Sequence, residues 1–400
     1  MTTANFAFVL GVIFKCVSLY FVIIALFCLK KPAPYLKCKP VHRFAILIAA
    51  RNEQGVIGDL VHSLLAQDYP RDLFDVYVIP NNCTDQTQAA AEAAGAKIIS
   101  CSYPVRCKGD VLHQAVDQLL YGAVHYDGFL VFDADNVVDK QFLARINDAF
   151  CSGALLAKGR HLAKNPTDSW VAGCYGLYFS TFHLIFNRAR ANCGLSAKLV
   201  GTGFAVHRQV FEELGGWNTK TLAEDAEFSA QCAKLGHRVF WVPDAVTYDE
   251  EPNSFSLSLR QRRRWCSGIM DVARAELPSL WSAWRQAPSL LIIDSMANLI
   301  FPFVQALSVI PLLLTLFSMN LVSALMLSAG SLALTYVGTA ALGFIASQGE
   351  QRTLKAILCY PLFMATWLPL QVVSLFRRTT VWKPISHSRS LAVKPAVFSR

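Results

Sequence analysis

The stretch Gly128-Phe129-Leu130-Val131-Phe132-Asp133-Ala134-Asp135-Asn136 joins an apolar run to two carboxylates. The four apolar residues 129–132 predict a strand that is buried on both faces, as in a parallel sheet. Asp133 and Asp135 follow where this strand should end, and ligands of open α/β sheets bind beyond the carboxyl ends of the strands. Their hard oxygen atoms suit Mg²⁺ or Mn²⁺ shared with substrate phosphates. A turn is the alternative interpretation, because Asp is common in turns.

Composition restricts the class of protein. The 400 residues are 54% hydrophobic and only 16% charged, because long apolar runs lie near both ends. The net charge is +9, and the basic residues gather beside these apolar runs. Because the sequence contains no nucleic-acid-binding motif, we expect membrane lipids and no nucleic acid as partners. The twelve cysteines show neither Cys-x-x-Cys nor metal-ligand spacing, which predicts reduced thiols in a cytosol-facing domain.

Apolar segments of membrane-spanning length flank the middle of the chain. Residues 1–30 predict an amino-terminal transmembrane helix, and the lysines that follow predict a cytosolic location for the next domain. A signal peptide is the alternative. About three further spans are expected within residues 289–378, before a basic tail at 379–400. Four spans would leave the carboxyl terminus outside, whereas Arg377 and Arg378 favour the inside. We expect an integral protein of the inner or plasma membrane.

Strands and helices alternate between residues 44 and 250. Apolar strands are predicted at 44–50, 75–79 and 97–99, each followed by a polar loop and a helical segment. This order predicts an α/β fold with a parallel, doubly wound sheet. The polar loops should then meet at one edge of the sheet and form a nucleotide site.

Several short motifs occur in the order typical of one known family. The chain resembles family 2 glycosyltransferases of the membrane-embedded, polysaccharide-synthase type, which include cellulose, hyaluronan and chitin synthases. The resemblance covers residues 44–268. The matching segments are Ala50-Arg51-Asn52-Glu53, Asn82-Cys83-Thr84-Asp85, Lys108-Gly109, Asp133-Ala134-Asp135, Gly201-Thr202-Gly203, Ala223-Glu224-Asp225 and Gln261-Arg262-Arg263-Arg264-Trp265.

The resemblance implies a fold, a reaction and a donor site. The fold is a GT-A domain, expected at residues 41–250, and the reaction is an inverting transfer of a hexosyl group from a nucleotide sugar. Asp135 and Asp133 are implied to hold Mg²⁺ or Mn²⁺. The residues implied to bind the donor nucleotide are Ala50, Arg51, Glu53, Asn81, Asp85, Lys108 and Asp133.

One position departs from the family pattern. The family usually has an Asp after the second strand, where it accepts a hydrogen bond from the nucleobase, and Asn81 holds this place after Pro80. The amide oxygen can still accept that hydrogen bond, and the NH₂ group can also donate. The resemblance therefore implies a UDP-sugar as donor, and Asn81 is the one donor-site residue that departs from the family pattern.

The catalytic base is implied to be Asp225. Residues 222–235 predict a helix, so Asp225 lies in its first turn, where an acidic helix start is the plain alternative. Gln261, Arg264 and Trp265 share one helix face, on interfacial helices expected at residues 251–288. The residues implied to bind the acceptor are Gly201, Thr202, Gly203, Glu224, Gln261, Arg264 and Trp265.

Two neighbouring segments are expected at the membrane surface. Arg260, Arg262 and Arg263 lie on other helix faces from Gln261 and are candidates to bind anionic lipid. The aromatic helical stretch 170–191 is expected either to dock the catalytic domain at the bilayer interface or to form a core helix.

Three functions remain open at this point. The first is elongation of a polysaccharide from a UDP-hexose or UDP-N-acetylhexosamine. The second is transfer of one sugar to a polyprenyl phosphate or another lipid acceptor. The third is a non-catalytic, nucleotide-binding transporter or scaffold, which would have no use for a base at Asp225. The expected partners are the nucleotide sugar and a glycan or lipid-linked acceptor, with partner subunits left open.

Overall fold

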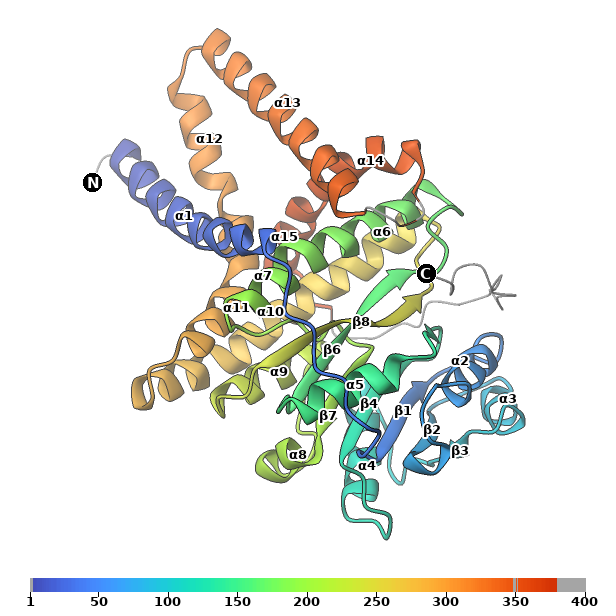
Figure 1. Cartoon of the computed structure of the whole chain (residues 1–400). Coiled ribbons are helices and arrows are strands. Elements are labelled where there is room, and N and C mark those ends of the chain that lie inside the picture. The colour runs from blue at the N-terminus through green and yellow to red at the C-terminus, as the bar shows by residue number, and fades with distance from the viewer. Residues whose placement is uncertain (1–2, 348–349, 351, 380–400) are drawn as a thin grey trace. The chain divides into compact units, whose positions relative to one another are not determined.

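The computed structural model describes residues 3–347, 350 and 352–379 of the chain (Figure 1). These residues divide into two compact units, which are treated separately below. The helical unit comprises the described parts of Met1–Lys31, Asn165–Gly194 and Glu251–Thr379. The sheet unit comprises Pro32–Lys164 and Leu195–Glu250.

The sheet unit is built on one mixed sheet whose described strands run in the order β3-β2-β1-β4-β7-β6-β8-β5 (Figure 1). The strands β1 to β4 are mutually parallel, whereas β7 runs antiparallel to both β4 and β6. The prediction of an α/β fold with a mostly parallel sheet is confirmed. The strand bounds are β1 Phe44–Ala50, β2 Phe74–Pro80, β3 Lys97–Ile98, β4 Gly128–Asp133, β5 Val137–Val138, β6 Leu156–Ala163, β7 Phe204–His207 and β8 Val239–Asp249.

Apolar side chains cover both faces of this sheet, because successive residues of a strand point to opposite faces. Leu130 and Phe132 of β4 belong to the core that α2 and α5 close, while Phe129 lies 5.3 Å from Phe211 of α8, measured between ring centroids. The helices of the sheet unit are α2 Ile57–Leu65, α3 Thr87–Ala93, α4 Lys108–Leu120, α5 Phe142–Cys151, α8 Arg208–Leu214 and α9 Glu224–Lys234, with a short 3-10 helix η2 at Arg71–Leu73.

The register of the parallel strands brings the predicted donor residues to one edge. Ala50, the last residue of β1, pairs with Pro80 at the end of β2, and Ala49 pairs with Asp133 at the end of β4. The loops that follow these three strands therefore leave the sheet at the same edge.

The segment before β1 is fastened to α5. The backbone N–H of Cys38 donates to Asp148 at 2.8 Å, and Cys38 forms a disulfide with Cys151, across 113 residues of sequence. The prediction of reduced thiols is therefore wrong for this pair, while the other ten cysteines are free. Sequence spacing did not reveal the pair, because only the packing of residues 32–43 on α5 brings the two thiols together.

The helical unit contains the long apolar helices. Three candidate membrane spans are found among the described residues, at Leu290–Phe317, Leu321–Ala346 and Leu354–Phe376. Near the amino terminus Phe14–Leu29 is a shorter apolar helix within the described part. The helices are α1 Thr3–Leu26, η1 Phe27–Leu29, α6 Trp170–Phe182, the π-helix η3 His183–Arg188, α7 Ala189–Asn192, α10 Phe255–Gln286, α11 Leu290–Leu307, α12 Val309–Ser318, α13 Leu321–Ala346, α14 Leu354–Ala365 and α15 Trp367–Phe376. The predicted basic tail at 379–400 lies, beyond residue 379, outside the described residues.

Two features of the helical unit differ from expectation. The aromatic segment Asn165–Gly194 belongs to this unit and packs α6 against α14, although the predicted catalytic domain, 41–250, included it. Arg262 does not face lipid. It is fully buried in α10, where it donates to the Phe363 carbonyl at 3.1 Å and to Thr366 Oγ1 at 2.8 Å, at the break between α14 and α15.

Candidate active site

Asn81 lies at the carboxyl end of β2 and is tied to the end of β1. Its backbone N–H donates to the Ala50 carbonyl at 2.9 Å, and its side-chain Nδ2 donates to the same carbonyl at 3.0 Å and to the Ile79 carbonyl at 3.4 Å. Because the N–H groups of Asn81 already donate to backbone carbonyls, its amide oxygen is the group that can accept a hydrogen bond from a nucleobase.

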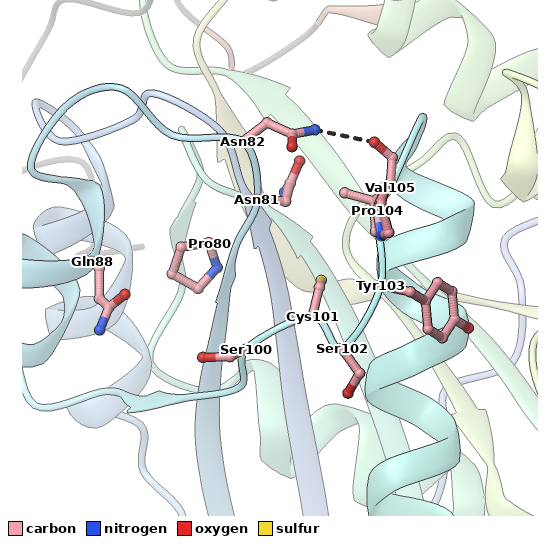
Figure 2. A pocket seen from close by; sticks show the side chains of 10 residues that line it. All are labelled: Pro80, Asn81, Asn82, Gln88, Ser100, Cys101, Ser102, Tyr103, Pro104 and Val105. Carbon is pink, nitrogen blue, oxygen red and sulfur yellow. Dashed lines mark hydrogen bonds between the residues drawn. The ribbon is translucent and has the colours of Figure 1, made fainter.

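A pocket of about 410 Å³ opens beside Asn81, where a nucleobase is expected. Figure 2 shows the residues that follow β2 on one wall and the segment that follows β3 on the other, with Asn82 Nδ2 donating to the Val105 carbonyl at 3.1 Å. Apolar and polar groups both line it, as in most small-molecule sites. Its lining residues are Pro80, Asn81, Asn82, Gln88, Ser100, Cys101, Ser102, Tyr103, Pro104 and Val105.

The loop after β1 is fixed to the loop after β2. The buried Glu53 donates its backbone N–H to Thr87 Oγ1 at 2.8 Å, and Asp85 accepts from the backbone N–H groups of Gln54, at 3.2 Å, and Thr87, at 3.1 Å. Asp85 thus organises the start of α3. The donor-binding roles of Arg51, Glu53 and Asp85 stay predictions.

Lys108, the first residue of α4, joins Asp133 to the turn that follows residue 200. Its Nζ atom pairs with Asp133 Oδ1, donates to the Gly201 carbonyl at 2.7 Å, and lies 4.0 Å from Glu224 Oε1. Burial alone would lower the pKa of Lys108, but the Asp133 and Glu224 carboxylates outweigh burial and raise it. Lys108 is therefore a fixed positive charge at the edge of the sheet.

The turn at residues 200–203 is conformationally unusual. Val200, Gly201 and Gly203 have φ angles of 54°, 72° and 59°, a region that a β-branched residue such as Val200 rarely adopts. A Cβ atom at Gly203 would meet Thr247 Oγ1 at 3.1 Å, so this position favours glycine. Thr202 Oγ1 accepts from the Asp133 backbone N–H at 3.0 Å and donates to Asn136 Oδ1, which joins the turn to the end of β4.

Asp135 is 8% exposed and lies among residues that the sequence did not single out. Its Oδ2 accepts from the Glu250 backbone N–H at 3.3 Å, and Asn136 Nδ2 lies 3.4 Å from Asp135 Oδ1 and 3.1 Å from Asp249 Oδ1. Burial, reinforced by the Asp135 charge and opposed by Lys158, raises the pKa of the Asp249 carboxyl well above its usual range.

The carboxylates at this edge fit a divalent cation whose other ligands come from a substrate. Within the described ranges, no group of three or more His, Cys, Asp or Glu side chains could hold a metal ion without further ligands. Mg²⁺ is usually held by one or two carboxylates together with phosphate oxygens and water. Asp135 and Asp133 supply oxygens of this kind, and their role as metal ligands remains a prediction.

Glu224 and Asp225 open helix α9, as predicted for a base in a first helical turn. Glu224 is 9% exposed, and its burial raises its pKa to about 7, with Lys108 opposing this shift and Asp225 reinforcing it. Glu227 accepts from the backbone N–H of Thr221 at 2.7 Å and so fixes the segment that leads into α9.

Asp133 and Asp225 act on the same two lysines. Both carboxylates interact electrostatically with Lys108, and both interact with Lys158 of β6. The predicted diphosphate and base residues therefore lie around one pair of ammonium groups, together with the Gly201–Gly203 turn. The sequence signals missed Lys158 because it lies in the middle of β6 and not at a strand end. Asp249, at the end of β8, could have been found by the rule that sites follow strand ends.

The predicted acceptor residues of α10 lie in the helical unit. Tyr175 donates its hydroxyl to Gln261 Oε1 at 2.8 Å, and the Trp265 ring lies 6.2 Å from the Trp367 ring, nearly parallel to it. Arg264 is half-buried on the same helix. Their acceptor-binding roles stay predictions, as do those of Gly201, Thr202, Gly203 and Glu224.

The sheet and its polar carboxyl edge define a GT-A domain, the fold of nucleotide-sugar-dependent glycosyltransferases. The chain belongs to glycosyltransferase family 2: residues 42–268 match the family described as "Glycosyltransferase like family 2". The predictions of this family, of a GT-A fold and of a hexosyl-transferring enzyme are confirmed.

Several named proteins are similar in sequence to this chain, and the share of the chain that each one matches differs. A probable glycosyltransferase, YdaM of Bacillus subtilis, is 26% identical over 84% of this chain and 83% of the relative. A beta-monoglucosyldiacylglycerol synthase of Synechocystis is 28% identical, over 57% of this chain and 48% of the relative. The UDP-forming cellulose synthase 1 catalytic subunit of Komagataeibacter xylinus is 24% identical, over 71% and 38%. The chain thus matches less than half of the length of these last two proteins.

A solved structure shares the fold. The mannosyltransferase PcManGT from Pyrobaculum calidifontis, in complex with GDP-Man and Mn²⁺, aligns over 90% of this chain and 98% of its own, with a TM-score of 0.62 and 19% sequence identity.

Proposed function

We propose that this chain is a membrane-integral, inverting glycosyltransferase that transfers a hexosyl group from a UDP-sugar to a growing polysaccharide. The observation that carries the proposal is the grouping of Asp133 and Asp225 around Lys108 and Lys158, beside the Gly201–Gly203 turn. One edge of the sheet thereby combines groups suited to a diphosphate with a carboxylate suited to an acceptor hydroxyl.

The donor is proposed to extend from the pocket beside Asn81 to Lys108. The nucleobase would donate a hydrogen bond to the amide oxygen of Asn81, and the diphosphate would meet the Lys108 ammonium group. A divalent cation held by Asp135 and Asp133 would neutralise the charge of the leaving diphosphate. The PcManGT complex contains Mn²⁺ with its nucleotide sugar, in keeping with this requirement.

The transfer itself needs a base and a positioned acceptor. Asp225 takes the proton of the acceptor hydroxyl while its oxygen forms a bond to the anomeric carbon. The bond between that carbon and the diphosphate oxygen breaks, and the electron pair leaves with the nucleoside diphosphate. Lys108 stabilises this negative charge, because its ammonium is already fixed where the charge develops.

The location is part of the proposal. Among the described residues three helices are long and apolar enough to cross a membrane, and Lys30, Lys31, Lys37 and Lys39 follow the apolar helix near the amino terminus. The positive-inside rule then favours a cytosolic sheet unit, where nucleotide sugars are available.

A second candidate is transfer of one sugar to a lipid. It is favoured by the similarity to the beta-monoglucosyldiacylglycerol synthase of Synechocystis, which is 28% identical over 57% of this chain. The non-catalytic alternative has no use for a base at Asp225.

Membranes that contain the protein distinguish these functions. They are incubated with a panel of radiolabelled UDP-sugars, with Mg²⁺ or Mn²⁺ or with EDTA, and the products are separated into polymer, lipid-linked sugar and free sugar. The proposal predicts metal-dependent label in polymer. Label confined to a lipid-linked monosaccharide would establish the second function, and no incorporation from any UDP-sugar would contradict both.

A further inference from the structure

Lys158 is a fully buried cation of the proposed site, and the transfer steps described above give it no role of its own. It lies within β6, opposite Phe204 of β7 and Trp241 of β8, and its side chain is inaccessible to solvent. Its Nζ atom donates a hydrogen bond to the Thr202 carbonyl. A buried ammonium group is costly unless nearby charges and hydrogen bonds compensate for lost hydration.

Three carboxylates provide that compensation. Asp249, Asp225 and Asp133 all raise the proton affinity of Lys158, whereas burial, the largest influence, lowers its pKa to about 8. These carboxylates belong to different segments, at the ends of β8 and β4 and at the start of α9. Lys158 therefore interacts electrostatically both with Asp225, the proposed base, and with Asp133, which is proposed to bind the diphosphate through a metal ion.

The Gly201–Gly203 turn is held by two lysines in succession. Lys108 donates to the Gly201 carbonyl at 2.7 Å, and Lys158 donates to the next carbonyl, that of Thr202. Because Val200, Gly201 and Gly203 all have positive φ angles, the turn needs such outside support to keep its conformation. Lys108 approaches from α4 and Lys158 from β6.

We infer that Lys158 is a positioning residue of the transfer reaction, which fixes the Gly201–Gly203 turn for the acceptor and balances the charge of Asp225, Asp133 and Asp249. This inference rests on the proposed function, since it assigns the turn to the acceptor. Lys158 touches neither donor nor acceptor directly, because it is buried behind the turn.

Substitutions that separate the hydrogen bond from the charge test the inference. Lys158→Met removes both, and Lys158→Gln keeps a donor for the Thr202 carbonyl but removes the charge. Lys140→Met is the matched control, because Lys140 is an exposed lysine of the same unit that pairs with the exposed Asp68 at 3.9 Å. The full-length protein is assayed in membranes with the UDP-sugar that labels product, and calorimetry of the detergent-purified protein measures UDP binding with Mn²⁺.

Lys158→Met should lower kcat at least about tenfold while the donor KM and the UDP affinity stay within about threefold of wild type, with a smaller loss of kcat for Lys158→Gln. A kcat within twofold of wild type for both variants would overturn the inference. So would a loss of UDP affinity as large as the loss of kcat, which indicates a general structural defect. Failure of the proposed function differs, because the wild type itself would then place label only in a lipid-linked sugar or in no product at all.

Discussion

The ammonium group of Lys108 is paired with the carboxylate of Asp133, and it also holds the Gly201 carbonyl at 2.7 Å. One side chain thereby connects the proposed diphosphate site with the proposed acceptor turn. A sugar donor whose diphosphate binds the Lys108 ammonium group therefore lies at a fixed position relative to the Gly201–Gly203 turn. A substitution of Lys108 therefore affects donor binding and acceptor positioning together.

Substitution of Lys108 should therefore damage both sides. We expect Lys108→Met to raise the donor KM and lower kcat, with kcat/KM reduced about 10-fold to 100-fold, since hydrogen bonds to charged groups contribute about 1.5–3 kcal/mol. Steady-state kinetics with the labelled UDP-sugar measures this. Lys140→Met is the control, and a Lys108→Met enzyme with unchanged kcat/KM would remove Lys108 from the site.

Asn81 should not be replaceable by the Asp that is usual in the family. Asn81 Nδ2 donates to the Ala50 carbonyl at 3.0 Å, so Asn81→Asp would place a carboxylate oxygen against a carbonyl oxygen. We expect a rise of about fivefold or more in the donor KM. Gln88→Glu is an amide-to-acid control at the same pocket, because the Gln88 Nε2 contacts the exposed Glu92 carboxylate at 2.9 Å and not a backbone carbonyl. An equal or lower donor KM for Asn81→Asp would refute this explanation.

The donor KM should depend on pH through Glu224. Burial raises the pKa of Glu224 to about 7, so it is protonated below this pH and ionised above it. An ionised Glu224, 4.0 Å from Lys108, competes with the diphosphate for the ammonium group. The donor KM should therefore rise as the pH increases from about 6 to about 8, and Glu224→Gln should flatten this dependence. An identical slope in both proteins would contradict the assignment.

Much of the sheet unit could be predicted from sequence because its strands are short apolar runs that end in polar residues. Strand β1 has the predicted bounds, Phe44–Ala50, while Asp133 ends β4 and Asn81 directly follows β2. Parallel pairing then brings these ends together without further information. The GT-A assignment follows from the same order of elements.

The remaining features depend on contacts between distant segments. Lys158 reaches Thr202 across 44 residues, and Cys38 reaches Cys151 across 113, so no local pattern reports either contact. The aromatic helix α6 has the composition of a core helix, but apolar composition does not say which core it joins. Its place in the helical unit, against α14, follows only from the structure.

Packing behind α9 should support the position of the base. Trp217 is fully buried and its ring stacks on Phe228 of α9 at 4.2 Å, while its Nε1 donates to Thr219 Oγ1 at 2.8 Å. Trp217→Ala should cost about 3–5 kcal/mol of stability and lower the thermal midpoint of the purified protein. Trp281→Ala is the matched control, because Trp281 is 53% exposed. Equal midpoints for the two variants would show that this core does not stabilise α9.

The most direct test of the central claim compares turnover and donor binding in Asp225→Asn. The substitution keeps the size of the side chain and removes the base, whose general-base contribution is about 100-fold to 10,000-fold. We predict a loss of kcat in this range, with UDP affinity in the presence of Mn²⁺ within about threefold of wild type. Full turnover by Asp225→Asn, or a loss of UDP binding that matches the loss of turnover, would contradict the account.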